Sequence, residues 1–537
     1  MRTVIFIIII VSSIFPQCWV ATYNGPASNY DFSINLVLGN NGCIYITGRS
    51  KGIDCDYDYC TIKYNGSGIE EWVRRYNGKA NSSDCARAIA TDNNSNVYVT
   101  GVSRVSDSTS YSEIVTIKYN PDGEVVWLTR YGAGWTEDWG SDVIYDNNGN
   151  VYVTGSSGNL PQIYPIAIKY DANGVQEWAV ADTIRGWTVS IGLDEQGNVY
   201  TAGFQIVRDS TRYSIIKYNS DGVIQWRAGD NILGYVYKLK VSSAGDVYVT
   251  GASGIGYTGN WQWDIVTAKY NTFGQEQWVQ VYDDSVNGWD EGQSLTLDNQ
   301  GNVYVTGPSA TQPGNVPAFD FVTIKYSSSG TEEWIRRYDG FESDDYPFDI
   351  EVDNQKDVYV GGYSAGFNNN GWSEDATIVK YDSSGNQIWV ARYDGISNNS
   401  DWISGLALDE QGYIYATGFT ELYPYNTDYL TIKYPPSGPG VSENPKDITQ
   451  YGQIIVNPNP FRKLVRFDFQ ISNVLSPINI KIYNLSGRVL RTFKEVSTSS
   501  IIWDGKDDSN MSLPSGIYFV NCYSKNYQFI RKVIKQN

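Results

Sequence analysis

Carboxylates and aromatic rings recur along this 537-residue chain, and they are the side chains that could do chemistry. Histidine is absent, which removes the most common general base, the Ser–His–Asp and Cys–His devices and every histidine-ligated metal site. Carboxylate chemistry remains available, either as acid–base catalysis or as hydrogen bonding to a polar ligand.

Two acidic series and one aromatic series have a member in most of eight repeated segments. The first acidic series is Asp31, Asp84, Asp138, Asp290, Asp345 and Asp401, with Gly186 and Gly234 at the other two positions. The residues that follow these eight, called here the collar residues, are Phe32, Cys85, Trp139, Trp187, Tyr235, Glu291, Tyr346 and Trp402. The second acidic series is Asp58, Glu113, Asp264, Asp320, Asp375 and Asp428, interrupted by Tyr164 and Arg212.

Two interpretations of these series stay open. Recurrence in every repeat favours turn capping and packing. The alternative is a surface for a carbohydrate or a cationic ligand, in which rings stack on the ligand and carboxylates accept its hydrogen bonds. The candidate ligand-binding residues are then Trp139, Trp187, Tyr235, Tyr346, Trp402, Asp138, Asp345 and Asp401.

No catalytic residue, metal site or cofactor is predicted. Acids stand in almost every repeat, so no pair is singled out for glycoside hydrolysis. The spacing of Asp54, Asp56 and Asp58 suggests calcium, but the rest of a calcium-binding loop is missing.

The elements that must position these residues are short strands in an internal repeat. NVYVTG stands at 96–101, 150–155 and 302–307, with variants in five further places, and IKYN-x-x-G-x-x-x-W recurs around Lys63 and seven later lysines. Each repeat of about 50 residues contains four strand-like runs separated by turn residues, which is the signature of a β-propeller blade. In a propeller the first strand of each blade lies innermost, so the collar residues would surround the mouth of the central channel.

The tryptophans predict how the ring closes. Seven of eight repeats have a fourth-strand tryptophan, and the last repeat ends at Pro435 without one. The segment Trp19–Gly25 matches Trp72–Gly78, so the N-terminal strand is expected to complete the last blade and remove the exposed sheet edge. The repeated tryptophans are expected to pack between blades, and the repeated lysines to pair with first-turn acids such as Asp92, Asp146, Asp194 and Asp298.

NVYVTG together with IKYN-x-x-G-x-x-x-W resembles the SBBP family of bacterial β-propeller repeats over residues 19–434. That family is often described as seven-bladed, whereas this chain offers eight copies. A looser likeness is to eight-bladed quinoprotein dehydrogenases, although nothing in this chain resembles their quinone site.

A different unit follows a Pro- and Gly-rich linker. From Lys446 onward there are 13 Lys and Arg against 6 Asp and Glu, a net charge of +7 in a chain whose total is −19. Short alternating strands predict a small β-sandwich. The motifs PNPF, IYNLSGR, WDG and LPSGIYF, in this order, resemble the C-terminal sorting domain of type IX secretion cargo, which is similar to an Ig-like domain. The resemblance implies passage through the outer membrane.

The expected organisation is a signal peptide (1–18), an eight-bladed propeller (19–434), a linker (435–453) and a C-terminal sandwich (454–537). Residues 4–15 are too short to span a bilayer, so no transmembrane segment is expected in the mature chain. Four of the six cysteines fall close together, and their pairing is left open: Cys43, Cys55, Cys60 and Cys85.

The leading hypothesis is a secreted or surface-attached binding protein whose partner is an extracellular glycan or a surface protein, and which meets the outer-membrane secretion machinery through its C-terminal domain. An extracellular carbohydrate-active enzyme, either a carboxylate-based hydrolase or a lyase, or a quinoprotein-like oxidoreductase, is the second. It would require one channel-mouth acid with a perturbed pKa that its counterparts lack. The third is a structural envelope protein without a small ligand. The net charge argues against nucleic acid as a partner.

Overall fold

A computed structural model describes most of the chain and divides it into two units, Met1–Val441 and Ser442–Asn537. The described residues are 19–27, 29–53, 56–106, 111–132, 136–254, 263–284, 288–311, 318–340, 344–368, 371–395, 397, 399–423, 426–438, 453–457, 461–470, 478–484, 489–496, 500–523 and 528–536. The predicted signal peptide, Cys55 and residues 439–452 of the predicted linker lie outside them.

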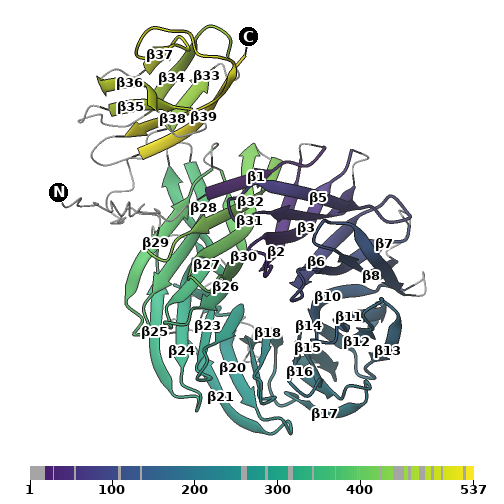
Figure 1. The fold of residues 1–537 in the computed structure, drawn as a ribbon. Helices are drawn as coiled ribbons and strands as arrows, with labels where there is room; N and C mark the ends of the chain where they lie inside the picture. Colours follow the sequence, from purple (N-terminus) through teal and green to yellow (C-terminus); the bar gives the residue numbers. More distant parts are fainter. Residues whose placement is uncertain are drawn as a thin grey trace, which may run out of the picture. The chain divides into compact units, whose positions relative to one another are not determined.

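The first unit is an eight-bladed β-propeller of four-stranded antiparallel sheets, each ordered as a meander (Figure 1). Blades 1 to 4 consist of β2 (Asp31–Leu38), β3 (Ile44–Lys51), β4 (Tyr57–Tyr64), β5 (Glu70–Tyr76); β6 (Asp84–Thr91), β7 (Val97–Arg104), β8 (Ser112–Tyr119), β9 (Val125–Tyr131); β10 (Trp139–Tyr145), β11 (Val151–Asn159), β12 (Gln162–Tyr170), β13 (Gln176–Ala181); and β14 (Gly186–Leu193), β15 (Val199–Val207), β16 (Ser210–Tyr218), β17 (Ile224–Ala228). Blades 5 to 8 consist of β18 (Tyr235–Val241), β19 (Val247–Ser253), β20 (Asp264–Tyr270), β21 (Glu276–Tyr282); β22 (Ser294–Leu297), β23 (Val303–Ala310), β24 (Phe319–Tyr326), β25 (Glu332–Tyr338); β26 (Asp345–Val352), β27 (Val358–Asn368), β28 (Gly371–Tyr381), β29 (Gln387–Tyr393); and β30 (Asp401–Leu408), β31 (Ile414–Tyr423), β32 (Asn426–Tyr434) with β1 (Trp19–Tyr23).

The ring closes through the N-terminal strand, as predicted. β1 is the outer strand of blade 8 and pairs antiparallel with β32, with Trp19 opposite Lys433. This register matches that of blade 1, where Trp72 lies opposite Lys63. Figure 1 shows β1 beside β32 at the junction of the two ends of the propeller.

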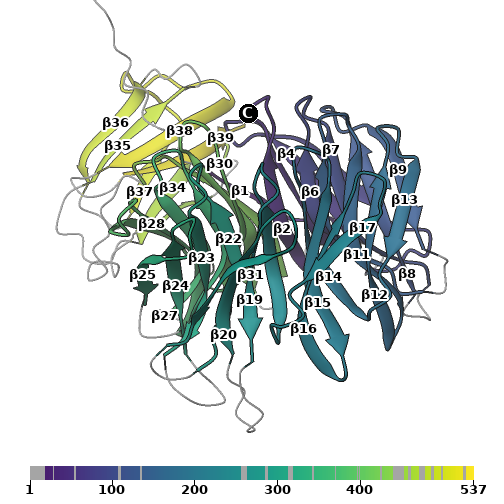
Figure 2. The same ribbon diagram turned by 90° about the horizontal axis from the view of Figure 1, so that it is seen from below.

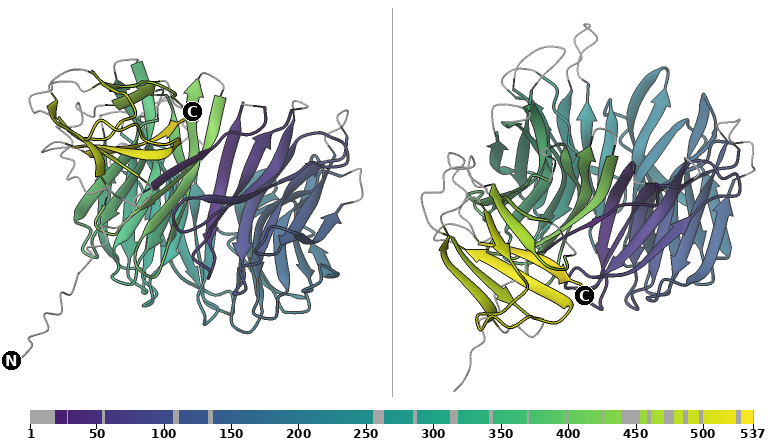
Figure 3. Two further views of the ribbon diagram at one scale, coloured as in Figure 1. Left: turned by 45° about the horizontal axis from the view of Figure 1, so that its top comes forward. Right: turned by 90° about the horizontal axis from the view of Figure 1, so that it is seen from above.

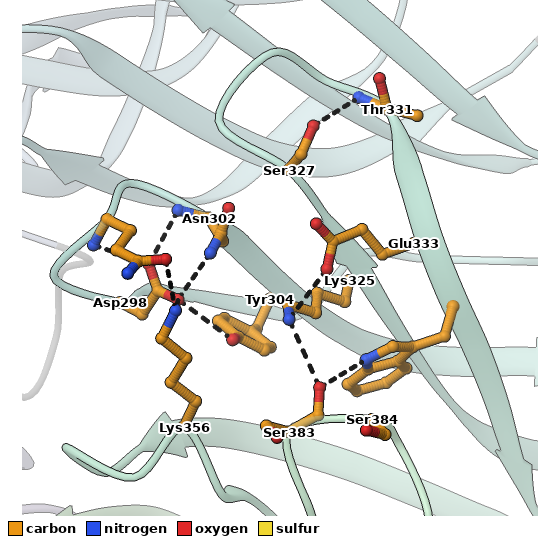
Figure 4. Close-up of polar contacts among 12 residues, drawn as sticks. Asp298, Asn302, Tyr304, Lys325, Ser327, Thr331, Glu333, Lys356, Ser383 and Ser384 are labelled. Atoms are coloured by element: carbon orange, nitrogen blue, oxygen red, sulfur yellow. Dashed lines mark hydrogen bonds and ion pairs between the residues drawn. The ribbon is translucent and has the colours of Figure 1, made fainter.

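The fourth-strand tryptophans join adjacent blades, again as predicted. Trp334 of blade 6 donates its indole Nε1–H to the backbone carbonyl of Ser383 in blade 7 at 3.3 Å (Figure 4). Gly385 lies under the same ring with φ +80°, and a Cβ there would sit 2.8 Å from the indole. Glycine is therefore required both for the left-handed backbone and for the close approach. The equivalent tryptophans make the same indole-to-carbonyl bond to the next blade: Trp19, Trp72, Trp127, Trp178, Trp226, Trp278 and Trp389.

The prediction for the repeated lysines is confirmed in some blades and wrong in others. Lys269 pairs with the first-turn acid Asp246 at 2.9 Å, and Lys380 pairs with Asp357 at 2.8 Å. Lys217 lies 3.9 Å from the first-turn acid Asp194, but Lys325 pairs with Glu333 at 2.9 Å, across the hairpin of its own blade. Asp298 caps its own turn instead, accepting from the backbone amides of Gln300 and Asn302 at 2.9 Å each (Figure 4). A lysine stem is long enough to reach the next strand, so its repeat position alone does not select its partner.

The first strand of each blade surrounds the central axis (Figures 1 and 2). The first strand is the inner edge of each sheet. The second and third strands lie between neighbouring blades, which cover both of their faces, as the side views of Figure 3 show. Val97–Gly101 and Ile114–Ile117 are accordingly buried without alternation. This continuous burial explains why the VYVTG and TIKY runs do not alternate between apolar and polar residues.

The second unit contains two antiparallel sheets, one ordered β33 (Gln453–Asn457), β34 (Val465–Gln470), β37 (Ser500–Trp503), and one ordered β36 (Val489–Val496), β35 (Ile478–Tyr483), β38 (Gly516–Tyr523), β39 (Gln528–Lys535). Its core holds the aromatic residues of the sequence motifs. The Trp503 ring is fully buried and lies 5.4 Å from that of Phe461 and 5.5 Å from that of Tyr518. The motifs therefore specify the core of this unit.

Three of the clustered cysteines are described, and all three are free thiols: Cys43, Cys60 and Cys85. Burial raises the pKa of the Cys60 thiol to about 12, so it remains protonated. None of the described cysteines in the propeller forms a bridge.

Candidate ligand-binding face

The motif glycine of the second strand sets the position of each collar residue. In blade 8, a Cβ on Gly418 would overlap the backbone carbonyl of Trp402, which lies opposite on β30. The register of β30 against β31 then shifts by one residue between Ile403 and Gly405, forming a bulge. The same overlap with the collar carbonyl occurs at the second-strand glycine of every blade: Gly48, Gly101, Gly155, Gly203, Gly251, Gly307 and Gly362. The repeated glycine thus allows the innermost strand to bend at the collar.

The first acidic series does not face solvent. Its six aspartates are fully buried: Asp31, Asp84, Asp138, Asp290, Asp345 and Asp401. Asp401 accepts a hydrogen bond from the backbone amide of Gly395 at 2.6 Å, and Asp345 accepts one from Gly340 at 2.6 Å. These glycines belong to the Tyr-x-Gly run that leaves the fourth strand of the preceding blade. These hydrogen bonds hold the segment that connects one blade to the next. The Tyr-x-Gly run recurs in the sequence and could have indicated this role.

Burial raises the pKa of these carboxyls throughout the series. The pKa of Asp401 rises to about 8 and that of Asp345 to about 7, with hydrogen bonds from Thr420 and Ser364 acting in the opposite direction. Burial also raises the pKa of Asp138, where Ser157 and Thr136 oppose it. The other three members show the same direction, so the perturbation belongs to the position in the repeat: Asp31, Asp84 and Asp290.

The predicted aromatic residues do not form one uniform ring but belong to two runs of contacting rings, with Trp139 outside both. The longer run crosses blades 7, 8 and 1. Trp402 stacks on Tyr363 with centroids 4.6 Å apart and on Phe348 at 5.7 Å, and it contacts Phe419 at 5.1 Å. Tyr346 begins the run, 6.1 Å from Tyr363, and Phe32 ends it, 4.9 Å from Phe419.

The shorter run lies in blades 4 and 5. The ring of Phe204 is 5.0 Å from that of Trp187 and 4.8 Å from that of Tyr235, and Tyr235 in turn lies 5.4 Å from Trp263. Trp139 belongs to neither run; the guanidinium of Arg87 lies over its ring at 5.7 Å. All five predicted aromatic residues are half-buried, so their rings reach solvent.

Two glutamates not selected from the sequence lie at the edges of the longer run. Trp402 donates its indole N–H to Glu374 at 2.6 Å. Glu291 accepts from the indole of Trp289 at 2.6 Å and from the hydroxyl of Tyr346 at 3.2 Å. Glu291 replaces an aromatic residue in the collar series, and this exception was the only sequence signal for it.

The central channel contains a cavity of about 650 Å³ lined by the innermost strands. Lys238 and Lys240 of β18 face it together with Asp349 and Glu351 of β26. Burial acts to lower the pKa of Lys238, but the charges of Asp349, Asp142 and Glu351 outweigh it and raise that pKa. The channel is therefore a polar, charge-paired space, which the repeat pattern did not reveal because these positions differ from blade to blade.

These features define an all-β eight-bladed propeller with a surface of half-buried rings, joined to a small two-sheet unit. Residues 71–107, 126–160 and 388–421 match the SBBP β-propeller repeat, and residues 455–536 match the secretion system C-terminal sorting domain. The chain thus carries SBBP propeller repeats followed by a type IX sorting domain. It is exported by that route to the cell surface or the medium. The described residues include no helix that could cross a membrane.

Individual relatives are distant. An uncharacterized WD repeat-containing protein of Acanthamoeba polyphaga mimivirus is 28% identical over 169 residues, which is 28% of this chain and 11% of that relative. Among solved structures, PorZ, an essential surface component of the type-IX secretion system of Porphyromonas gingivalis, is 12% identical, covers 94% of this chain and 81% of its own, and has a TM-score of 0.26. A polysaccharide lyase is 11% identical, with 67% and 91% covered and a TM-score of 0.41.

Proposed function

We propose that this protein is an exported binding protein that holds a glycan against the aromatic run of blades 7, 8 and 1. The observation that carries the proposal is a group of half-buried rings: Trp402 stacks on Tyr363, contacts Phe419 and donates its indole N–H to the carboxylate of Glu374. Flat apolar surfaces next to a hydrogen-bond acceptor suit the two kinds of surface on a sugar ring, its C–H face and its hydroxyl edge.

Binding is favoured over catalysis by the behaviour of the acids. A catalytic carboxyl is expected to differ from its counterparts, because acid–base catalysis needs one pKa tuned for the reaction. Here the first acidic series shares both burial and a raised pKa. Asp345 and Asp401 accept hydrogen bonds from the backbone between blades, and Asp138 accepts one from the hydroxyl of Thr136. Asp138, Asp345 and Asp401 accordingly act as supports for the collar, and the proposed ligand contacts are rings and glutamates.

A glycan array tests the proposal. The purified protein and Trp402→Ala and Glu374→Gln variants are compared, with melting temperatures recorded to establish that each variant is folded. We expect at least a tenfold loss of affinity in Trp402→Ala and a smaller loss in Glu374→Gln. Trp187→Ala, in the run of blades 4 and 5, is the matched control and should retain binding.

Two outcomes would overturn the proposal. One is a folded wild-type protein that binds no glycan, which would leave a protein partner as the next candidate. The other is full binding by Trp402→Ala, which would move the ligand away from this run.

A further inference from the structure

An acid–arginine pair recurs at the start of the third strand. Asp58 and Asp320 are the second residues of β4 and β24, and Asp375 is the fifth residue of β28. Each forms an ion pair with an arginine near the end of the fourth strand of the same blade. The pairs are Arg75–Asp58 at 2.7 Å, Arg337–Asp320 at 2.9 Å and Arg392–Asp375 at 3.0 Å. The strand register explains the recurrence, because each arginine lies opposite the residue two positions after the aspartate.

Blades 5 and 8 have the aspartate but not the arginine. In blade 8, Thr22 lies opposite Leu430, two positions after Asp428. In blade 5, Asp264 opens β20, and Val281 lies opposite Val266, which is the position of the arginine in blades 1, 6 and 7. Asp264 is only 7% exposed. Among the described residues, no cation and no hydrogen-bond donor is paired with its carboxylate. A buried, unpartnered carboxylate is costly, so this position calls for a positive charge from another source.

Two further carboxylates converge on Asp264. One oxygen each of Asp264, Asp283 and Asp290 lies within 4.8 Å of the others. Oxygen ligands of one Ca²⁺ lie at 2.3–2.6 Å from the ion and hence at most about 5 Å from each other, so this spacing fits a single ion. Asp290 is fully buried, whereas Asp283 is exposed and leaves the cluster open to solvent.

The electrostatics of the cluster agree with this geometry. Burial raises the pKa of Asp264 to about 6, with the charges of Asp283 and Asp284 adding to the rise, and burial raises the pKa of Asp290 to about 6. The adjacent Asp284 is paired with Arg337 at 3.2 Å. That guanidinium also pairs with Asp320, so it belongs to the next cluster along the ring.

We propose that Asp264, Asp283 and Asp290 bind a divalent cation of the calcium class between blades 5 and 6, in place of the arginine found in blades 1, 6 and 7. Three carboxylates are hard oxygen ligands, and the absence of sulfur or nitrogen ligands from the set disfavours zinc or copper. The ion would connect the third strand of one blade to the first segment of the next. The equivalent connections before blades 7 and 8 are held by the hydrogen bonds of Asp345 and Asp401.

Terbium luminescence tests the site, because Trp263 and Trp289 directly precede Asp264 and Asp290 and can sensitise a bound Tb³⁺ ion. The probes are Tb³⁺, then Ca²⁺ as a competitor, with Ca²⁺ titration calorimetry of the whole protein. We expect luminescence that Ca²⁺ displaces, and at least a tenfold loss of ion affinity in Val281→Arg and Asp264→Asn. Val281→Arg reproduces the arginine of blades 1, 6 and 7, so it should fold and melt at or above the temperature of the ion-free protein.

Val281→Met and Asp320→Asn are the matched controls. The first adds a long side chain without charge, and the second alters the equivalent acid of blade 6; both should retain the ion. Unchanged Ca²⁺ affinity in Val281→Arg and Asp264→Asn would overturn the proposal, as would a wild-type protein that binds neither ion in the millimolar range.

Discussion

Substitution of Asp401 by asparagine should change how stability depends on pH. Burial raises the pKa of this carboxyl from 3.8 to about 8 in the folded protein, and the charges of Asp394 and Asp375 add to the rise. The folded state therefore retains a proton that the unfolded chain releases near pH 4. The stability from this group is fully present below pH 4 and is lost as the pH rises to 8. The loss is about 1.4 kcal/mol per pH unit, with an upper limit of roughly 6 kcal/mol across the window.

Asparagine removes the titration but keeps an oxygen for the amide of Gly395, which donates to Asp401 at 2.6 Å. We therefore expect the free energy of unfolding of Asp401→Asn, relative to wild type, to rise by about 3–4 kcal/mol between pH 5 and pH 8. Denaturant unfolding followed by tryptophan fluorescence at half-unit pH steps measures it. Asp382→Asn is the control: hydrogen bonds from Asn386 lower the pKa of that exposed carboxyl, so it does not titrate in this window.

Parallel pH profiles for wild type and Asp401→Asn would refute the reasoning, because they would mean that Asp401 is ionised in the folded protein.

Two further predictions concern the junctions between blades. Gly385→Ala should lower the free energy of unfolding by about 2–3 kcal/mol, because the residue has φ +80° and its new methyl would meet the indole of Trp334; Gly42→Ala, at φ +72° with open space around it, should lose only about 1 kcal/mol in the same denaturant titration. Arg337→Val should free the blade 6 cluster of Asp320, Asp339 and Asp345 from its guanidinium and raise the number of Tb³⁺ ions bound from one to two; an unchanged stoichiometry would mean that three converging acids do not suffice.

The sequence was sufficient to predict the architecture because each repeat keeps the same spacing of strands, turns and packing tryptophans. The eight copies, the closing strand that begins at Trp19 and the packing of Trp72 and its counterparts follow from spacing alone, and the structure confirms them. Each is a property of position in the blade, which eight copies make visible.

The candidate site was less predictable, since periodicity identifies a position but not the direction of its side chain. The acids Asp138, Asp345 and Asp401 lie at the start of the first strand, as predicted, and the structure adds that all three are fully buried, which their spacing did not indicate. Glu374, which accepts the indole hydrogen bond of Trp402, lies on the β27–β28 hairpin at the position that Tyr57 occupies in blade 1 and Phe319 in blade 6, so the repeat did not single it out. The absence of an arginine at Val281 could be recognised only from the strand register, which aligns this residue with Arg75, Arg337 and Arg392 of blades 1, 6 and 7.

The closing strand has a consequence for the order of folding. Blade 8 takes three strands from β30, β31 and β32 and its fourth from β1, so residues about 400 positions apart in the chain must meet before the ring is complete. The other seven blades form from consecutive segments and can assemble as soon as they are synthesised, whereas this last blade requires both chain ends of the propeller at once. The N-terminal strand β1 therefore has no partner until β32, which ends at Tyr434, has been synthesised. A circularly permuted chain that starts at Asp31 and carries Trp19–Tyr23 after β32 would keep the pairing of β1 with β32 but would build its last blade, like the other seven, from neighbouring strands.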